Sequence, residues 1–470
     1  MSEIIERMEA ALAAQRAAFA RHPFPSRKER QFKLNALKDV LQGWQGRMIR
    51  AVNADFGTRS ATETRLIEVL GPTLEANHAI KHLGRWMRPR RRHTELLFAT
   101  NRAWVEYQPK GVVGIIVPWN FPVYLGIGPL IAALAAGNRA MIKMSEFTPR
   151  TTEVVAGMLA DAFHEDEVAV FGGEVEEARA FGALPFDHIV FTGSPAVGRH
   201  VMRAAAEHLV PVTLELGGKS PALVAPGADL ADAAKRVAHG KAFNAGQVCL
   251  SPDYALVQRA SVETFTEAVA TAFGRMYPQV QGNADYTSII TERHAERLRG
   301  LVADAETKGG RAVVAGEHGS GRQLPLTIVN EVRDDMGLAE EEIFGPILPV
   351  IPYDTIEDAL AYINARPRPL AIYAFGVEGE ELESLKKQTH SGGISINDWG
   401  WHAFQHDLPF GGIGNSGMGS YHGEEGFREL SHAKAVFRRH RFFPTGMLYP
   451  PYGGLLQRMA MRLFLKDPED

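Results

Sequence analysis

Residues 188–198 read His-Ile-Val-Phe-Thr-Gly-Ser-Pro-Ala-Val-Gly. They predict a strand, a tight turn at Gly193, and a helix that Ser194 caps and Pro195 opens. The free N–H groups at such a helix N-terminus can hold a phosphate group. An ordinary strand-to-helix turn fits the same residues, because the spacing is GxxxxG rather than GxGxxG.

Apolar strands of the same kind recur on both sides of this stretch, separated by helical segments. The first series comprises Val112–Val117, Ala140–Lys143, Val168–Phe171, His188–Thr192 and Val212–Leu216. Their starts lie between 20 and 28 residues apart, which leaves room for helical crossovers between parallel strands. The second series comprises Ala222–Val224, Tyr254–Val257, Ala312–Ala315, Leu348–Ile351, Ala371–Phe375 and Ile394–Ile396. The pattern predicts an α/β fold of two α/β domains, the first of the Rossmann type.

Helices and a small β element complete the expected organisation. Residues 1–60 are expected to be helical, and Ser26 with Glu29 has the spacing of a capping box. Thr148 followed by Pro149 predicts another helix start. Residues 95–107 alternate in bulk like a hairpin, and residues 433–437 could supply its partner strand. Such an element builds either a subunit contact or a simple edge hairpin.

Length and composition exclude several classes of protein. The chain has 470 residues, more than the about 250–300 that one hydrophobic core supports. Its apolar share of 45% and charged share of 23% exclude disorder of the whole chain. The net charge of −4 and the lack of a long basic stripe argue against nucleic-acid binding. The short run Arg88, Arg90, Arg91 and Arg92 is typical of a solvated loop or an interface patch.

The cysteine and histidine content sets expectations about compartment and metals. Cys249 is the only cysteine, which excludes an intramolecular disulfide and makes a reducing cytoplasm the expected location. Residues 1–21 lack the features of a secretory signal, and no apolar run reaches the about 18 residues of a membrane span. His402 and His406 are spaced like metal ligands, but their flanks indicate a loop, and we expect no metal site.

Three residues are candidates for catalysis. Cys249 stands in a loop with Gly246 and Pro252 nearby, where a thiolate could act as a nucleophile, although a lone cysteine is also a common buried apolar residue. Glu215 is the one charge within Val212–Leu216, which fits either a catalytic base or a buried ion pair. Asn120 follows Val112–Val117 at the edge where α/β sheets bind ligands, and it can donate to an oxyanion.

A second group of residues is suited to a dinucleotide. Glu146 ends a predicted strand, where a carboxylate binds the hydroxyls of a ribose, and Lys143 stands beside it. A carboxylate repels a 2′-phosphate, so this pair favours NAD over NADP, although NADP stays possible. A surface ion pair is the simpler explanation of these two residues taken alone.

Seven motifs in this order and spacing resemble the aldehyde dehydrogenase superfamily, over about residues 20–440. They are Pro118–Pro122, Lys143 with Glu146, Phe191–Ser194, Leu214–Lys219, Gly246–Cys249, Glu342–Pro346 and Pro409–Gly412. Thr213–Pro221 and Ser251–Tyr254 resemble the class 3 branch of that superfamily. Ser416–Gly419 and Tyr421–Gly423 are similar to its coniferyl aldehyde dehydrogenase group.

The resemblance implies a mechanism. Cys249 would form a thiohemiacetal with an aldehyde, and Asn120 with the Cys249 N–H would hold the oxyanion while hydride passes to the nicotinamide. Glu215 would then activate water to hydrolyse the thioester. The cofactor-binding residues implied in this way are Trp119, Lys143, Glu146, Gly193, Ser194, Leu216, Glu342 and Phe344.

The resemblance also indicates the substrate class. The implied substrate tunnel is lined by Tyr124, Val248, Leu250, Trp399, Trp401 and Phe404. These side chains are mostly bulky and apolar, which favours an aromatic aldehyde or a long apolar one over a small polar one. A fatty aldehyde dehydrogenase is the alternative. A coenzyme A-acylating enzyme and a non-catalytic relative are weaker alternatives, because Glu215 and Cys249 are both present.

The expected domains follow the same resemblance. Residues 1–92 and 109–218 would form the NAD-binding domain, and 219–415 the catalytic domain. Residues 93–108 and 428–442 would form an oligomerisation element of a homodimer. Residues 443–470 would form an amphipathic tail that covers the partner subunit or the tunnel mouth, with membrane contact as an alternative.

Overall fold

The computed structural model describes residues 3–316, 321–443 and 445–465. The chain divides into two compact units, Met1–Trp86 with Pro109–Ser431 and Met87–Gln108 with His432–Asp470. Within the described residues, the larger unit holds a six-stranded and a seven-stranded sheet, which confirms the expected α/β fold class.

The first sheet carries the Rossmann-type half of the larger unit. Its parallel strands are β3 (Val112–Ile116), β4 (Arg139–Lys143), β5 (Val168–Phe171), β6 (His188–Gly193) and β7 (Val212–Leu216), and the antiparallel β15 (Gly417–Met418) adds an edge. The strand order is β15-β7-β6-β3-β4-β5. Because the parallel strands all end at the same edge, the loops that follow them meet there.

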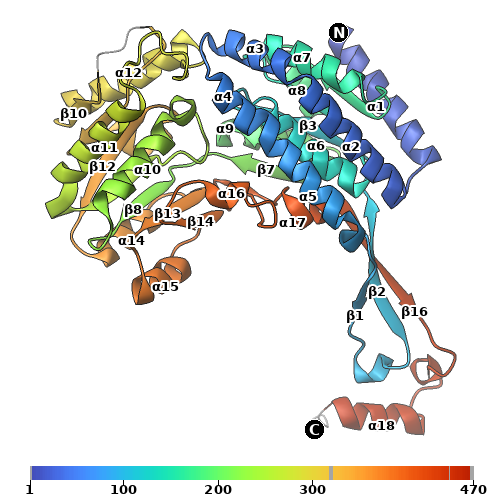
Figure 1. The fold of residues 1–470 in the computed structure, drawn as a ribbon. Helices are drawn as coiled ribbons and strands as arrows, with labels where there is room; N and C mark the ends of the chain where they lie inside the picture. The colour runs from blue at the N-terminus through green and yellow to red at the C-terminus, as the bar shows by residue number, and fades with distance from the viewer. Residues whose placement is uncertain (1–2, 317–320, 444, 466–470) are drawn as a thin grey trace. The chain divides into compact units, whose positions relative to one another are not determined.

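Helices cover both faces of this sheet, as a parallel sheet requires. Helices α1 (Glu3–Arg21), α8 (Val175–Gly182) and α9 (Pro195–Ala206) share one hydrophobic core with it. On the other face, α6 (Tyr124–Ala136) is buried along its whole length, and it packs against β3, β4, α2 (Arg27–Gly43) and α5 (Gly71–Trp86) (Figure 1). The remaining elements of this half are α3 (Gln45–Phe56), α4 (Ala61–Thr64), a π-helical turn η1 (Arg65–Leu70) and α7 (Pro149–Ala160).

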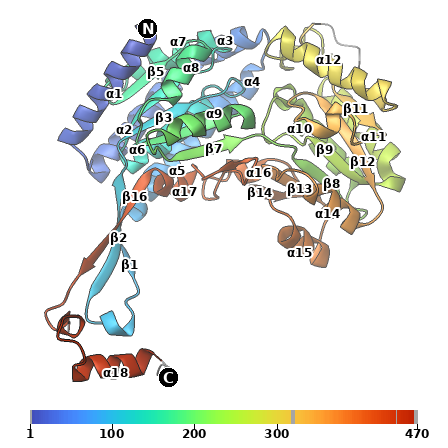
Figure 2. The same ribbon diagram turned by 180° about the vertical axis from the view of Figure 1, so that it is seen from behind.

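The second sheet has the strand order β10-β11-β12-β9-β8-β13-β14. These strands are β8 (Pro221–Val224), β9 (Tyr254–Gln258), β10 (Arg311–Val314), β11 (Thr327–Asn330), β12 (Ile347–Tyr353), β13 (Ala371–Phe375) and β14 (Gly393–Ile396). Figure 2 shows β7 of the first sheet leading directly into β8 of the second. The helices of this half are α10 (Leu230–Ala242), α11 (Val262–Met276), α12 (Glu292–Thr307), α13 (Gly337–Glu340), α14 (Ile356–Asn364) and α15 (Gly379–Gln388). Two short helices follow, α16 (Trp401–Phe404) and α17 (Gly423–Glu429).

The smaller unit is a sheet of the order β1-β2-β16, with β1 (Arg90–Arg92), β2 (Arg102–Pro109) and β16 (Ser431–Arg438). Helix α18 (Leu455–Phe464) follows it in the chain and exposes Leu455, Leu456, Met459, Leu463 and Phe464. None of the described helices combines the length and the apolar character that crossing a membrane requires. Residues 444 and 466–470 of the expected tail lie outside the described residues.

Most of the predicted elements are confirmed. All strands predicted in the two series are present, with no end shifted by more than two residues, and Ser26 and Glu29 form the capping box. Three short strands were missed, namely β1, β11 and β15. The predicted hairpin over 95–107 was wrong in its first arm, because residues 96–98 form a 3₁₀ turn and Arg90–Arg92 pairs with β2 instead. Helix α7 begins at Pro149 as expected, but the Thr148 side chain makes no capping hydrogen bond.

A buried arginine holds the C-terminal end of α6. The Arg30 guanidinium donates to the carbonyl groups of Ala135 at 3.0 Å and Ala136 at 2.7 Å, and to that of Pro25 at 2.9 Å. These carbonyl groups of α6 lie at the end of the helix, where no further turn can supply an N–H group. Arg30 therefore replaces the missing helical hydrogen bonds.

We predict that Arg30→Met lowers the free energy of unfolding by about 2–3 kcal/mol, because buried carbonyl groups lose charged hydrogen-bond donors. Urea unfolding measures this change. Arg259→Met is the matched control, since Arg259 pairs with Asp354 on the surface, and it should change stability little. Equal effects of the two substitutions would contradict the role given to Arg30.

Candidate active site

The three candidate catalytic residues lie on different elements. Asn120 follows β3, Glu215 lies near the end of β7, and Cys249 lies in the loop between α10 and β9. Asn120 is buried, and its Nδ2 donates to the backbone carbonyl of Gln247 at 3.2 Å. This hydrogen bond joins the turn after β3 directly to the segment that carries Cys249.

The segment before Cys249 has an unusual backbone. Asn244, Ala245 and Gly246 have positive φ values of 48°, 52° and 73°. A Cβ atom at Gly246 would lie 2.3 Å from the carbonyl oxygen of Gly345, so that position requires glycine. Two non-glycine residues in this region store backbone strain, which persists only where surrounding contacts compensate for it.

Side-chain hydrogen bonds supply that compensation. Asn244 Nδ2 donates to the carbonyl groups of Asn120 and Gln247, both at 3.1 Å. The side chain of Gln247 donates to the carbonyl groups of Asn244 at 3.0 Å and Ser288 at 3.2 Å, and it accepts from the N–H of Ile290 at 2.9 Å. The Cys249 segment is therefore fixed by fully buried amide side chains.

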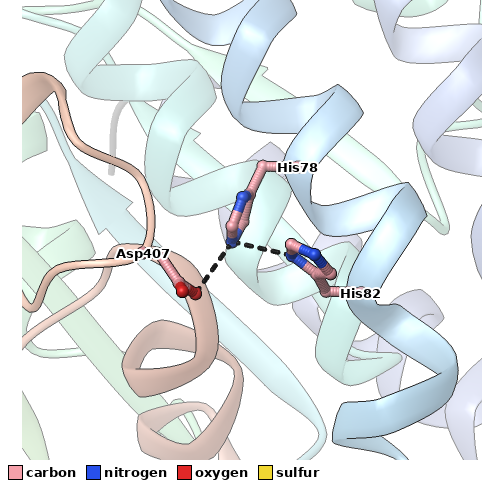
Figure 3. Close-up of side chains that lie close together, drawn as sticks. All are labelled: His78, His82 and Asp407. Atoms are coloured by element: carbon pink, nitrogen blue, oxygen red, sulfur yellow. Dashed lines mark hydrogen bonds and ion pairs between the residues drawn. The ribbon is translucent and has the colours of Figure 1, made fainter.

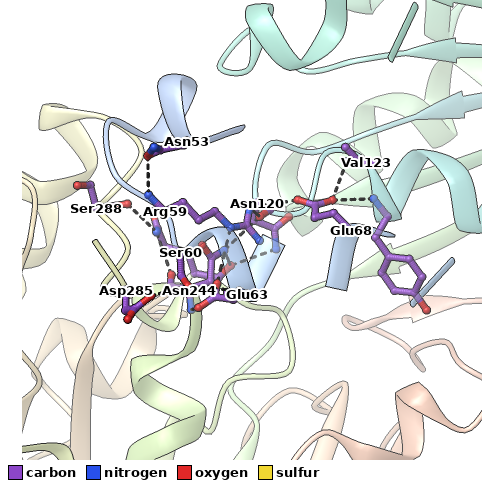
Figure 4. Close-up of polar contacts among 12 residues, drawn as sticks. Asn53, Arg59, Ser60, Glu63, Glu68, Asn120, Val123, Asn244, Asp285 and Ser288 are labelled. Atoms are coloured by element: carbon purple, nitrogen blue, oxygen red, sulfur yellow. Dashed lines mark hydrogen bonds and ion pairs between the residues drawn. The ribbon is translucent and has the colours of Figure 1, made fainter. Parts of the chain in front are cut away.

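Arg59, Glu63 and Glu68 form a buried ion network that contacts the backbone of Asn120 and Asn244 (Figure 4). Arg59 Nη1 donates to the Asn120 carbonyl at 2.9 Å and to Glu68 Oε1 at 3.2 Å. Glu63 accepts from the Asn244 N–H at 3.2 Å, and its carboxylate lies 3.7 Å from Arg59 Nε. All three charged side chains are buried, so each needs these partners.

Glu68 also fixes the start of α6. Its Oε2 accepts from the backbone N–H groups of Val123 at 2.9 Å and Tyr124 at 2.8 Å. Glu68 lies in the π-helical turn η1, a local geometry that is frequent at functional sites. Burial raises the pKa of Glu68 and raises that of Glu63 to about 7, while Arg59 opposes both shifts.

Cys249 and Glu215 form an electrostatically coupled pair. The Cys249 thiol is partly exposed, whereas Glu215 is 1% exposed and neither carboxylate oxygen has a well-formed hydrogen bond within the described part of the chain. Burial raises the pKa of Glu215 to about 8, the Glu342 carboxylate adds to this shift, and the Cys249 thiol opposes it. Burial and the carboxylates of Glu215 and Glu342 raise the pKa of Cys249. The unpartnered carboxyl group beside the thiol can accept a proton from an incoming group.

Glu342 and Phe344 approach this pair from the second half. The Glu342 carboxylate lies so close to Gly217 that a Cβ atom there would be 2.2 Å from Oε2. Burial raises the pKa of Glu342 to about 7. The ring of Phe344 lies edge-on to that of Trp119, with their centroids 5.4 Å apart. Trp119 belongs to the turn that carries Asn120, so both halves contribute to this aromatic contact.

The candidate phosphate and ribose ligands lie at the edge of the first sheet. Ser194 caps α9 by accepting from the Val197 N–H at 3.4 Å, and both Ser194 and Gly193 are accessible. Lys143 is buried and donates to the Met144 and Gly173 carbonyl groups, both at 2.8 Å, while Glu146 is partly exposed. A helix N-terminus and a nearby carboxylate match the phosphate and ribose of a dinucleotide, so the donor set fits this cofactor.

The expected tunnel residues fall into two groups. Val248 and Leu250 flank Cys249 and are buried, as is Tyr124. Trp399 is also buried, and its Nε1 donates to His239 Nδ1 at 3.0 Å. Trp401 is 62% exposed and donates to Asp398, and Phe404 is half-buried against its ring. His402 Nδ1 lies 2.8 Å from Ser395 Oγ.

Sequence reasoning missed the supporting residues. Arg59, Glu63 and Glu68 lie in a stretch that has no distinctive motif, and only the tertiary structure shows that they are buried together. Asn244 and Gln247 lie within a few residues of Cys249, so proximity to the candidate nucleophile was the one available signal.

Comparison with known proteins identifies the class of enzyme. The aldehyde dehydrogenase family model matches residues 2–436. A probable coniferyl aldehyde dehydrogenase of Pseudomonas aeruginosa is 51% identical over 98% of this chain and 97% of its own. A coniferyl aldehyde dehydrogenase of a Pseudomonas species is 47% identical over 82% of this chain and 81% of its own.

Solved structures agree with this result. A substrate-bound Staphylococcus aureus AldH has a TM-score of 0.91 at 33% identity, and the match covers 97% of this chain and 99% of that one. A Mycobacterium tuberculosis aldehyde dehydrogenase complexed with NAD⁺ has a TM-score of 0.83 at 32% identity, with 92% and 90% covered. The chain belongs to the aldehyde dehydrogenase family, an oxidoreductase family, as its motifs predicted.

Asn244 has a strained backbone with positive φ, and its side chain makes hydrogen bonds that position the site. We predict that Asn244→Ala and Asn244→Gly distinguish the effects of these two features. Both variants lose the hydrogen bonds to Asn120 and Gln247, so both should lower kcat/KM by about 10–100-fold through misplaced catalytic groups. Glycine tolerates a φ of 48° better than alanine, so Asn244→Gly should have the higher melting temperature. Wild-type kcat/KM in both variants would show that these hydrogen bonds do not position the site.

Proposed function

We propose that this enzyme oxidises an aromatic aldehyde of the coniferaldehyde type to its carboxylic acid, with NAD as the oxidant. The observation that carries the chemistry is the convergence of Cys249, Glu215 and Asn120 at one site. Relatives about 50% identical over nearly the whole chain, named as probable coniferyl aldehyde dehydrogenases, support the substrate class.

In the first half-reaction, the Cys249 thiol loses its proton to solvent, and the resulting thiolate attacks the carbonyl carbon of the aldehyde. Its Sγ–C bond forms as the carbonyl π electrons move to oxygen, and the Asn120 amide with the Cys249 N–H stabilises that oxyanion. The oxyanion then collapses to a thioester as hydride leaves the same carbon. NAD, when bound, supplies the hydride acceptor.

In the second half-reaction, Glu215 removes a proton from water, and the water oxygen attacks the thioester carbon. The C–S bond breaks, which releases the carboxylic acid, and Glu215 returns its proton to the Cys249 thiolate. The overall reaction consumes one aldehyde, one NAD⁺ and one water, and it yields one acid, one NADH and one proton. A buried base with no well-formed hydrogen bond within the described residues suits this step, because its raised pKa makes it a stronger proton acceptor.

Residues at the edge of the first sheet and near β12 support the cofactor assignment. We assign the ribose and phosphate groups to Lys143, Glu146, Gly193 and Ser194, with Leu216 beneath them. We assign the nicotinamide end to Trp119, Glu342 and Phe344. The carboxylate of Glu146 favours NAD over NADP by charge.

The aldehyde is held by Tyr124, Val248, Leu250, Trp399, Trp401 and Phe404. We assign residues 1–92 and 109–218 to cofactor binding, 219–415 to catalysis, and 93–108 with 428–442 to a homodimer contact. The edge strand β16 of the small sheet supports that contact, since an edge strand offers unpaired backbone groups. We propose a cytoplasmic enzyme whose α18 covers the partner subunit or the tunnel mouth rather than a membrane.

We predict that Cys249→Ala abolishes NADH formation, whereas Glu215→Gln keeps a single burst of NADH and loses most steady-state turnover. The burst survives because hydride transfer precedes the step that needs Glu215. Stopped-flow absorbance of NADH measures both phases. Steady oxidation by Cys249→Ala at the wild-type rate would contradict the mechanism.

We also predict that kcat of the wild-type enzyme rises as the pH increases through about 8. Only the deprotonated Glu215 accepts a proton from water, and its raised pKa places that transition near pH 8. Steady-state rates from pH 6 to 10 test this expectation. Glu215→Gln should lose the rise, and an unchanged profile in that variant would assign the transition to another group.

The substrate class is tested by kcat/KM for acetaldehyde, hexanal, decanal, benzaldehyde and coniferaldehyde. We expect the highest value for coniferaldehyde, because aromatic side chains line the assigned tunnel. A steady increase with alkyl chain length and a low value for coniferaldehyde would favour a fatty aldehyde instead. NADH formation that requires coenzyme A would indicate an acyl-transferring enzyme.

A further inference from the structure

A cluster of metal-binding side chains lies apart from Cys249 and its partners. His78 and His82 project from one face of α5, at the i and i+4 spacing that places two side chains side by side. Asp407 reaches them from the loop that follows α16 (Figure 3). One ligand atom from each of these side chains lies within 4.8 Å of the other two.

Hydrogen bonding does not fully satisfy this cluster. His78 Nε2 lies 3.1 Å from His82 Nδ1 and 3.4 Å from Asp407 Oδ1. A neutral imidazole carries one proton, so Nε2 has at most one proton to divide between two neighbours that both offer lone pairs. If Nε2 instead accepts a hydrogen bond from His82 Nδ1–H, it has no proton to donate to the Asp407 carboxylate. A cation at this point would interact favourably with all three side chains.

The distances are close to those of a tetrahedral metal site. Zinc binds imidazole nitrogen at about 2.0–2.1 Å and carboxylate oxygen at about 2.0–2.2 Å, which places neighbouring ligand atoms about 3.3–3.5 Å apart. The two observed separations, 3.1 and 3.4 Å, need only small side-chain movements to reach that geometry. The two histidines come from α5 and Asp407 comes from the loop after α16, so a bound ion would have protein ligands from two separate elements.

The surroundings of the cluster also favour a cation. His406 precedes Asp407, its ring centroid lies 6.3 Å from that of His78, and its buried Nδ1 has no hydrogen-bond partner among the described residues. Arg85 approaches Asp407 at 3.8 Å but has Glu424 as a closer partner at 3.4 Å.

We propose that His78, His82 and Asp407 bind a divalent transition-metal ion, with Zn²⁺ as the ion that best fits two imidazoles and one carboxylate. His406 is positioned to become a fourth ligand. The bound ion would tie α5 to the loop between α16 and Phe410. That loop follows Trp401 and Phe404, so the metal would stabilise a segment that we assign to the lining of the substrate tunnel. This site is distinct from the proposed oxidation chemistry, which uses no metal.

From the sequence, only the pair His402 and His406 was considered as a candidate for metal binding. His78 and His82 have the same spacing, and the structure shows that they lie on helix α5. Asp407 is more than 320 residues away in the sequence, so its contribution becomes visible only in the fold.

Metal binding by the full-length protein, without an affinity tag and after chelator treatment, tests the proposal. We expect isothermal titration to show one Zn²⁺ per chain, and Co²⁺ to give the visible absorption of a nitrogen and oxygen site. His78→Ala, His82→Ala and Asp407→Asn should each weaken Zn²⁺ binding at least 10-fold. Circular dichroism and thermal unfolding without metal establish that each variant is folded.

Two matched controls make the result specific. His164→Ala removes an exposed histidine of the same chain and should leave Zn²⁺ affinity unchanged. Cys249→Ala should also bind Zn²⁺ like the wild type, which separates this site from metal capture by the catalytic thiol. Zn²⁺ should raise the melting temperature of the wild type and of both controls, but not of His82→Ala.

Three outcomes would overturn the proposal. They are no saturable Zn²⁺ binding by the wild type, unchanged affinity in both His82→Ala and Asp407→Asn, and loss of binding in Cys249→Ala. Each can occur whether or not coniferaldehyde is the preferred substrate. The metal site and the proposed function can therefore fail independently.

Discussion

The buried guanidinium group of Arg59 connects the parts of the active site. It contacts the carbonyl oxygen of Asn120 and the carboxylates of Glu63 and Glu68, and these carboxylates hold the backbone at Asn244 and at the start of α6. Removing one charge from such a buried group leaves the others without compensation. The network therefore keeps the turn after β3 and the segment before Cys249 in one arrangement, although they come from different halves of the larger unit.

The sheet topology explains why so few contacts are sufficient to bring Asn120, Glu215 and Cys249 together. Parallel strands end at one edge, so β3 and β7 bring Asn120 and Glu215 to the same region without long loops. The left-handed backbone at residues 244–246 then turns the Cys249 segment toward them. Among the described residues, no group forms a well-formed hydrogen bond with the Glu215 carboxyl group, an arrangement that costs stability and preserves its ability to accept a proton.

Local signals made most of the fold predictable, because strand alternation, the capping box at Ser26 and the proline at 149 depend on neighbouring residues. The missed strand β11 is only four residues long. The missed strand β1 of the small sheet consists of three arginines, a composition that predicts a solvent-exposed loop rather than a strand. Cys249, Glu215 and Asn120 stood out because each is chemically unusual in its place. Arg59 and Glu68 did not, since their roles arise from burial and from partners distant in sequence.

A double-mutant cycle between Arg59 and Asn120 tests the positioning role of the buried network most directly. Arg59→Lys keeps the positive charge and loses the planar donor geometry, and Asn120→Ala removes the amide that Arg59 is proposed to position. The rate of NADH formation in a single turnover is measured for the wild type, both single variants and the double variant. If Arg59 acts through Asn120, Arg59→Lys slows the wild-type reaction but adds no further loss to Asn120→Ala. Independent, multiplicative losses would contradict the account.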